Sequence, residues 1–122
     1  MKRRGSNHMT KENKYFLAKI FTKKKELDDW IDILNNKKEC DLTENHINLI
    51  NQHFKLTEVL ESSLKMLNED EKMLIRAIYI ERMSNVELAD TLGMSQSTAS
   101  RRRKNASNKL AQYIHDYIGL SV

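Results

Sequence analysis

With 122 residues, 31% of them charged, three glycines and no proline, the chain has the composition of a soluble, mostly helical protein. No apolar run approaches the ~20 residues needed to cross a bilayer, so we expect no membrane partner. The basic start MKRRGSNHM leads into more charge, which does not resemble a signal peptide. The single cysteine, Cys40, cannot form an internal disulfide, and this favours a reducing, cytoplasmic location.

The net charge of +4 is distributed in blocks. Residues 1–38 carry eleven lysines and arginines against five acidic residues, and residues 39–68 carry two against five. Residues 95–110 carry five cations and no acid. Basic blocks favour a polyanionic partner, usually nucleic acid. The alternative for the N-terminal block is a solvated surface with a flexible tail.

The first eight residues stand apart from the rest. The letters GSNHM resemble a cloning scar, with Met9 as a candidate native start. We therefore interpret residues 1–8 as a tag remnant or a disordered basic tail, and begin the fold at residue 9.

Two amphipathic helices are predicted in the front half, over residues 11–35 and 44–67. Apolar residues recur at helical spacing in the first: Phe16, Phe21 (or Ile20), Leu27, Trp30, Ile31 and Leu34. They also recur in the second: Ile47, Ile50, Phe54, Leu60, Leu64 and Leu67. Thr43 is the candidate N-cap of the second helix, and a break near residues 55–57 is an open alternative.

The next helix is predicted over residues 69–82. Asn68 is its candidate N-cap, and Glu71 lies three residues later, as in a capping box. The segment is apolar around much of its circumference, which places it at the centre of the core. Its expected core residues are Met73, Leu74, Ala77, Ile78 and Ile80.

Two further helices follow, separated by one glycine. Ser84 and Glu87 form a second candidate capping box before a short helix, which Gly93 ends because glycine accepts a positive φ. Ser95 caps the last helix, which is predicted to continue to about Ile118. Its apolar seam is Ala99, Ala106, Leu110, Tyr113 or Ile114, and Tyr117.

The residues around Gly93 follow the spacing of a helix-turn-helix. Small side chains occur where two helices cross closely, and apolar residues surround them. The predicted helix-turn-helix core is Leu88, Ala89, Leu92, Gly93, Met94 and Ala99.

The exposed edge of the last helix carries groups that can read DNA. Glutamine can bond adenine, arginine can bond guanine, and serine or threonine can bond either base. The candidate base-reading residues are Gln96, Ser97, Ser100 and Arg101. Successive helix residues are ~100° apart, so neighbouring side chains should contact phosphates instead. These candidates are Ser95, Thr98, Arg102, Arg103 and Lys104. The alternative is a solvated basic face.

Residues 67–110 resemble region 4 of bacterial sigma factors. The motifs that carry the resemblance are L-x-x-x-E, S-x-x-E-L-A, L-G-M-S, S-x-S-T and A-S-N-K-L. The resemblance implies recognition of a −35 promoter element. Arg103 and Ser107 depart from it, because many relatives place leucines there. A short chain with a helical front half and such a module is similar to the ArpU-type late-gene regulators of phages, which implies a bacterial or phage origin.

No other site is predicted. His46 and His53 are seven residues apart with Cys40 upstream, but a zinc site needs a fourth ligand and tighter pairing. We recognise no catalytic set or phosphate-binding loop, and expect no enzyme activity, metal or cofactor.

The sequence therefore predicts an all-α protein. Residues 9–66 form a helical region that packs on the remainder, dimerises or contacts RNA polymerase, and residues 67–122 form the helix-turn-helix domain. The expected function is sequence-specific binding of double-stranded DNA to regulate transcription, with activation favoured by the resemblance. The alternatives are an adaptor that acts mainly through polymerase, and an accessory of recombination or DNA packaging.

Overall fold

The computed structural model describes residues 11–120, and the segment interpreted as a tag or tail lies outside them. The described chain consists of helices and turns without a strand, which confirms the all-α class. In chain order the elements are α1 (Lys11–Leu34), a 3₁₀ turn η1 (Glu39–Asp41), α2 (Glu44–Leu64), α3 (Glu69–Ile75), a π-helical turn η2 (Arg76–Ile80), α4 (Asn85–Leu92) and α5 (Gln96–Leu120).

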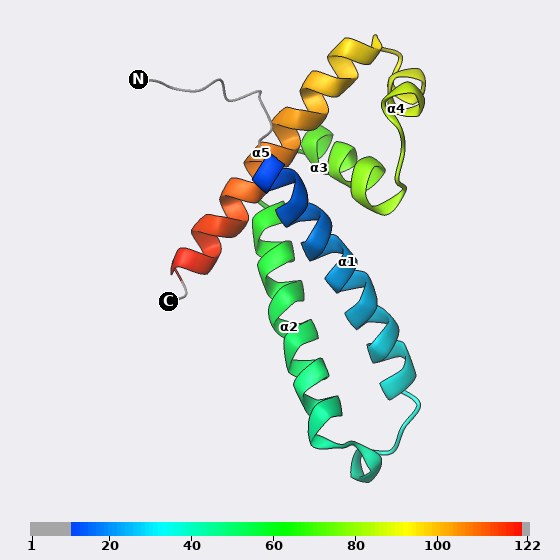
Figure 1. Cartoon of the computed structure of the whole chain (residues 1–122), viewed down its shortest axis with the longest axis vertical. Coiled ribbons are helices and arrows are strands. Elements are labelled where there is room, and N and C mark those ends of the chain that lie inside the picture. Colours follow the sequence, from blue (N-terminus) through cyan, green and yellow to red (C-terminus); the bar gives the residue numbers. More distant parts are fainter. Residues whose placement is uncertain (1–10, 121–122) are drawn as a thin grey trace.

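Helices α1 and α2 form an antiparallel hairpin that projects from the rest of the molecule (Figure 1). Thr43 caps α2 as predicted, because its hydroxyl accepts a hydrogen bond from His46 N while His46 Nδ1 accepts one from Thr43 N. His53 Nε2 lies 2.8 Å from Asp28 Oδ1 and joins the two helices near their middle. Helix α2 is continuous, so the break considered near residues 55–57 does not occur.

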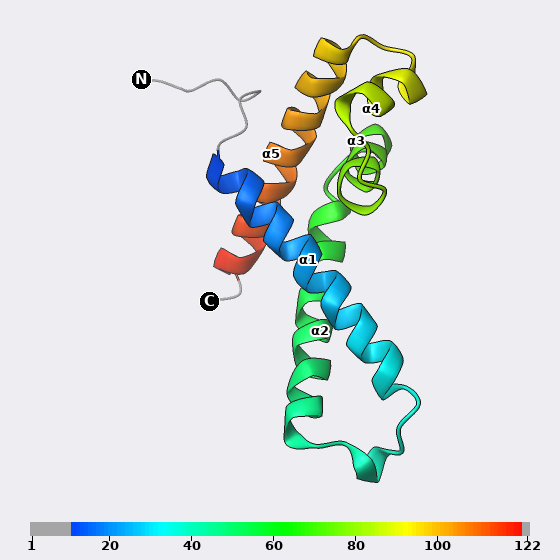
Figure 2. The same cartoon turned by 45° about the vertical axis from the view of Figure 1, so that its right-hand side comes forward.

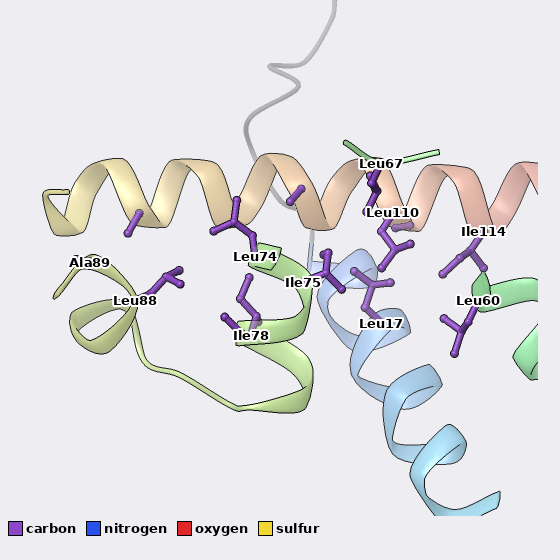
Figure 3. Close-up of a cluster of buried hydrophobic side chains, with 14 residues drawn as sticks. Leu17, Leu60, Leu67, Leu74, Ile75, Ile78, Leu88, Ala89, Leu110 and Ile114 are labelled. Atoms are coloured by element: carbon purple, nitrogen blue, oxygen red, sulfur yellow. The ribbon is translucent and has the colours of Figure 1, made fainter. Parts of the chain in front are cut away.

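The longest helix, α5, organises the remaining elements. Its first half packs against α3 and α4, and its second half packs against the base of the hairpin (Figures 1 and 2). Front and back halves of the chain therefore share one hydrophobic core. Figure 3 shows Leu17 of α1 and Leu60 of α2 in the same cluster as Leu110 and Ile114 of α5.

Several residues predicted for the core are exposed instead. In the described part of the chain no third helix packs on the far half of the hairpin, so Trp30, Ile47 and Phe54 keep 41%, 48% and 70% of their surface in solvent. Met73 and Ile80 are 48% and 61% exposed. The prediction assumed one regular helix over 69–82, whereas η2 widens the helix and changes the angle between successive side chains at Ile80. Met73 precedes η2 and lies on the exposed side of α3.

Candidate nucleic-acid interface

The turn between α4 and α5 has the geometry of a helix-turn-helix hinge. Gly93 adopts φ 66° and ψ 39°, the left-handed conformation that glycine accepts without strain. The N–H of Met94 then reaches back to the carbonyl of Ala89 at 3.0 Å. Leu88, Ala89 and Ala99 are buried, and Leu92 and Met94 pack against them. All six residues predicted for this core thus lie at the crossing.

The start of α5 is held by its own hydroxyl groups. Ser95 Oγ accepts a hydrogen bond from Thr98 N at 3.2 Å and donates one to Thr98 Oγ1 at 2.9 Å. Ser97 Oγ lies 3.3 Å from Ser95 Oγ. Ser95 therefore caps α5 by accepting from the backbone N–H of Thr98, and the helix dipole favours an anion near this end of the helix.

Three of the predicted DNA-binding side chains share the outward face of α5. Ala99 is fully buried, and Arg101 lies about 200° round the helix from it. Ser97, Arg101 and Lys104 recur at i, i+4 and i+7 on this face, and all three are exposed.

The other predicted residues lie elsewhere around the tip. Gln96 is exposed in the first turn, and Arg102 is exposed on the flank of the helix. Ser100 and Thr98 are half-buried.

The sign of the charge is uniform around this face. No acidic residue occurs in the sequence between Asp90 and Asp116. Among the described residues, Arg101, Arg102 and Lys104 form no ion pair with a carboxylate. Their charges are therefore available to a polyanion.

Arg103 lies on a different side of α5 from Arg101. It is half-buried, and its Nη1 donates a hydrogen bond to Asn85 Oδ1, at the first residue of α4, over 3.0 Å. The expectation that Arg103 contacts phosphate does not fit this position, because its guanidinium faces the neighbouring helix. Sequence reasoning missed Asn85, and the only signal was the cation at position 103, where the sequence departs from the sigma pattern.

A buried hydroxyl pair lies one turn further along α5. Tyr79 of η2 donates to Oγ of Ser107, which is fully buried, over 3.0 Å. Burial raises the pKa of Tyr79, although the Ser107 hydrogen bond and the nearby Arg103 charge oppose this. The Tyr79 ring stacks on Phe21 of α1, with centroids 4.8 Å apart. This aromatic pair therefore joins α1 of the hairpin to η2, in addition to the contacts that the hairpin makes with α5.

Helix α3 is joined to α5 by an ion pair. Glu71 completes the predicted capping box with Asn68, and its second carboxylate oxygen accepts a hydrogen bond from Lys109 Nζ. Lys109 is thus a cation of α5 that is already paired, unlike those of the outward face.

The remaining histidines have ordinary structural contacts. His53 pairs with Asp28, His46 bonds to Thr43, and His115 stacks on Phe16 at 4.2 Å. Within residues 11–120, no three His, Cys, Asp or Glu side chains are placed to hold a metal ion. No helix in the same part of the chain is long and apolar enough to cross a membrane.

Comparison with known proteins identifies one segment of the chain. Residues 63–112 match the family described as sigma-70, region 4. No curated protein and no solved structure matches the chain. The matched segment runs from the last turn of α2 into the second half of α5. It contains the hinge, the outward face and the three polar contacts Arg103–Asn85, Tyr79–Ser107 and Lys109–Glu71. This family binds DNA and is not catalytic, and residues 63–112 are a sigma region 4-like helix-turn-helix.

Proposed function

We propose that the chain is a sequence-specific regulator of transcription that inserts the first turns of α5 into the major groove of DNA. The observation that carries the proposal is the outward row of Ser97, Arg101 and Lys104, exposed and without acidic neighbours on α5, inside the segment that matches sigma region 4.

The positions of the side chains support a division of roles. Arg101 points away from the core and can bond guanine O6 and N7 with its forked guanidinium. Gln96, Ser97 and Ser100 lie within about one and a half turns of it and complete the base-reading edge. Arg102 and Lys104, with the N-terminal turn at Ser95 and Thr98, are placed for the groove walls, where cations and helix amides bind phosphate. Arg103 positions α5 against α4.

The proposed output is activation at promoters of a phage or another mobile element in the bacterial cytoplasm. This part rests on the resemblance of a short chain with a helical front half and a sigma-like module to ArpU-type regulators. The −35 element, or a site just upstream of it, is the proposed target.

The experiment is footprinting of the full chain on its source genome, followed by binding assays on the protected site. Arg101→Ala should lose about 1–3 kcal/mol of discrimination between the site and a site with the contacted guanine replaced. Lys109→Ala is the matched control, because Lys109 is a cation of the same helix that is paired with Glu71. If Arg101→Ala discriminates as well as the native protein, the assignment of this face is wrong.

A second candidate function is that of an adaptor that acts mainly through RNA polymerase. The hairpin favours it, because Ile47 and Phe54 are exposed on α2 far from the recognition helix. A full-length Arg101→Ala/Lys104→Ala variant separates the two functions. If it still activates transcription and captures polymerase, the adaptor is supported. A footprint at a terminal or packaging sequence would instead support a recombination or packaging accessory.

A further inference from the structure

Within residues 11–120, one side of α1 is covered by no other element. The helix packs against α2, α5 and η2, and in Figure 2 it crosses the near side of the molecule with nothing in front of it. Its uncovered side carries Tyr15, Ala18, Thr22 and Ile33 at helical spacing, all exposed. Tyr15 and Ile33 keep 62% and 53% of their surface in solvent. A helix of a monomer does not require large apolar side chains on this side.

A shallow hollow lies on the same side. Its volume is about 480 Å³, and its lining is Tyr15, Ala18, Lys19, Thr22, Lys23 and Glu26. Ala18 and Thr22 contribute small side chains to this lining. Lys19, Lys23 and Glu26 contribute two cations and one anion.

The charges along α1 divide into two opposite halves. Residues 11–25 carry six lysines and one acid, whereas residues 26–34 carry four acids and no lysine. The net charges are therefore +5 and −4. An antiparallel copy of α1 would place the basic half of each helix against the acidic half of the other. This charge complementarity points to a second copy of the chain as the partner of this side.

We propose that α1 pairs in antiparallel orientation with α1 of a second copy of this chain. The two copies are related by a two-fold axis that crosses α1 at the level of Lys24. Residues at equal distances from Lys24 then lie opposite each other. Tyr15 meets Ile33 of the second copy, since each is nine residues from Lys24. Such a contact is self-complementary and closed, which gives a dimer and not a filament.

The hollow is filled in this register. Trp30 of the second copy lies opposite Ala18, on the flank of α1 that carries Lys19 and Lys23. Trp30 keeps 41% of its surface in solvent beside His46 of α2, and this exposed part can enter the hollow. Glu26 of one copy lies within a residue of Lys23 of the other, and Lys19 lies one turn away. The ion pairs and the Trp30 ring therefore lie on the same side of the contact between the two helices.

The test is sedimentation equilibrium of the full chain over a range of concentrations. One helix from each copy is a small interface, so we expect a dissociation constant on the order of micromolar. In Glu26→Lys, each copy has three cations at positions 19, 23 and 26, and these face the same three cations of the other copy. The repulsion should raise the dissociation constant roughly tenfold or more. The triple exchange Lys19→Glu/Lys23→Glu/Glu26→Lys restores opposite charges and should return it towards the native value.

A control variant and a fluorescence measurement accompany the sedimentation experiment. Glu39→Lys makes the same charge change at the exposed tip of the hairpin and should leave the dimer intact. Trp30 is the only tryptophan, so its emission should shift to shorter wavelength as the dimer forms. A chain that is monomeric at all concentrations would overturn the proposal. So would a dimer that Glu26→Lys weakens and the triple exchange does not restore. If the chain is a monomer and still binds DNA, the dimer proposal is wrong and the proposed function stands.

Discussion

Arg103 of α5 donates a hydrogen bond to Asn85 of α4, and this contact joins the two helices of the helix-turn-helix over 3.0 Å. A leucine at position 103 would pack in the same gap without directional preference. The arginine instead specifies where the first turn of α4 lies relative to α5. The orientation of the recognition helix thus depends on a polar contact as well as on the buried residues Leu88 and Ala99.

The first prediction separates a positioning role for Arg103 from a phosphate contact. Arg103→Met should weaken binding to the specific site by about 1 kcal/mol, roughly fivefold, because the bond to Asn85 is lost at a half-buried site. The slope of log affinity against log salt concentration should stay unchanged. Lys104→Ala should instead lower the slope by ~0.9, as expected for one lost phosphate contact.

Asn85→Ala is the matched control for this prediction, because it removes the same hydrogen bond and leaves every cation in place. It should reproduce the affinity loss of Arg103→Met at an unchanged slope. If Arg103→Met lowers the slope as much as Lys104→Ala does, Arg103 contacts phosphate and the positioning role is wrong.

A second prediction concerns the buried hydroxyl pair of Tyr79 and Ser107. Tyr79→Phe should destabilise the fold by about 1–2 kcal/mol, because it leaves the fully buried Ser107 hydroxyl without its partner. The double variant Tyr79→Phe/Ser107→Ala should be less destabilised than the two single changes combined, since neither polar group is then left alone. Urea unfolding of the four proteins measures this coupling. Additive losses would show that the hydroxyl groups act independently.

Local features of this fold could be predicted from the sequence, and long-range ones could not. Asn68, Ser84 and Gly93 were identified because a cap depends on residues at most four positions away. The exposure of Phe54 depends on whether a third helix covers the hairpin, which the periodicity of α2 does not record. The same limit hid Leu17, which is fully buried although the pattern favoured Phe16 beside it.

The same division between local and long-range features applies to the candidate site. Spacing from Gly93 placed Arg101 on the outward face, because helix geometry fixes that angle once the hinge is known. The partner of Arg103 is on another helix, and the π-helical turn that brings Tyr79 to Ser107 has no sequence pattern of its own. These contacts required the structure.

A third prediction uses Gly93 and Arg82, the two residues with positive φ within residues 11–120. Gly93→Ala should destabilise the fold by about 1 kcal/mol through the backbone alone, because an added Cβ meets no atom within 4 Å. Arg82, at φ 56°, already carries this strain. Arg82→Gly should therefore be neutral or slightly stabilising, by less than about 1 kcal/mol. Thermal unfolding measures both, and equal losses from the two changes would contradict the assignment of strain.

The last prediction is a dependence of stability on pH that arises from Glu71. Burial acts to raise the pKa of this carboxyl, but hydrogen bonds from Lys109 and from the backbone N–H of Asn68 outweigh it and hold the pKa below the usual 4.5. The folded pKa is lower than the unfolded one. The stabilisation is therefore complete above pH 4.5 and is lost as the pH falls through the folded value.

Glu71→Gln isolates this contribution from those of the other carboxylates. At pH 7 the variant should be less stable than the native protein by about 1 kcal/mol, because an amide makes a weaker contact with Lys109 than a carboxylate does. The difference should shrink as the pH falls below 4.5 and Glu71 itself becomes neutral. Urea unfolding of both proteins at several pH values gives the difference directly. Glu39→Gln, at the exposed tip of the hairpin, is the control and should show no such trend. A difference that stays constant down to pH 3 would mean that the charge of Glu71 does not stabilise the join between α3 and α5.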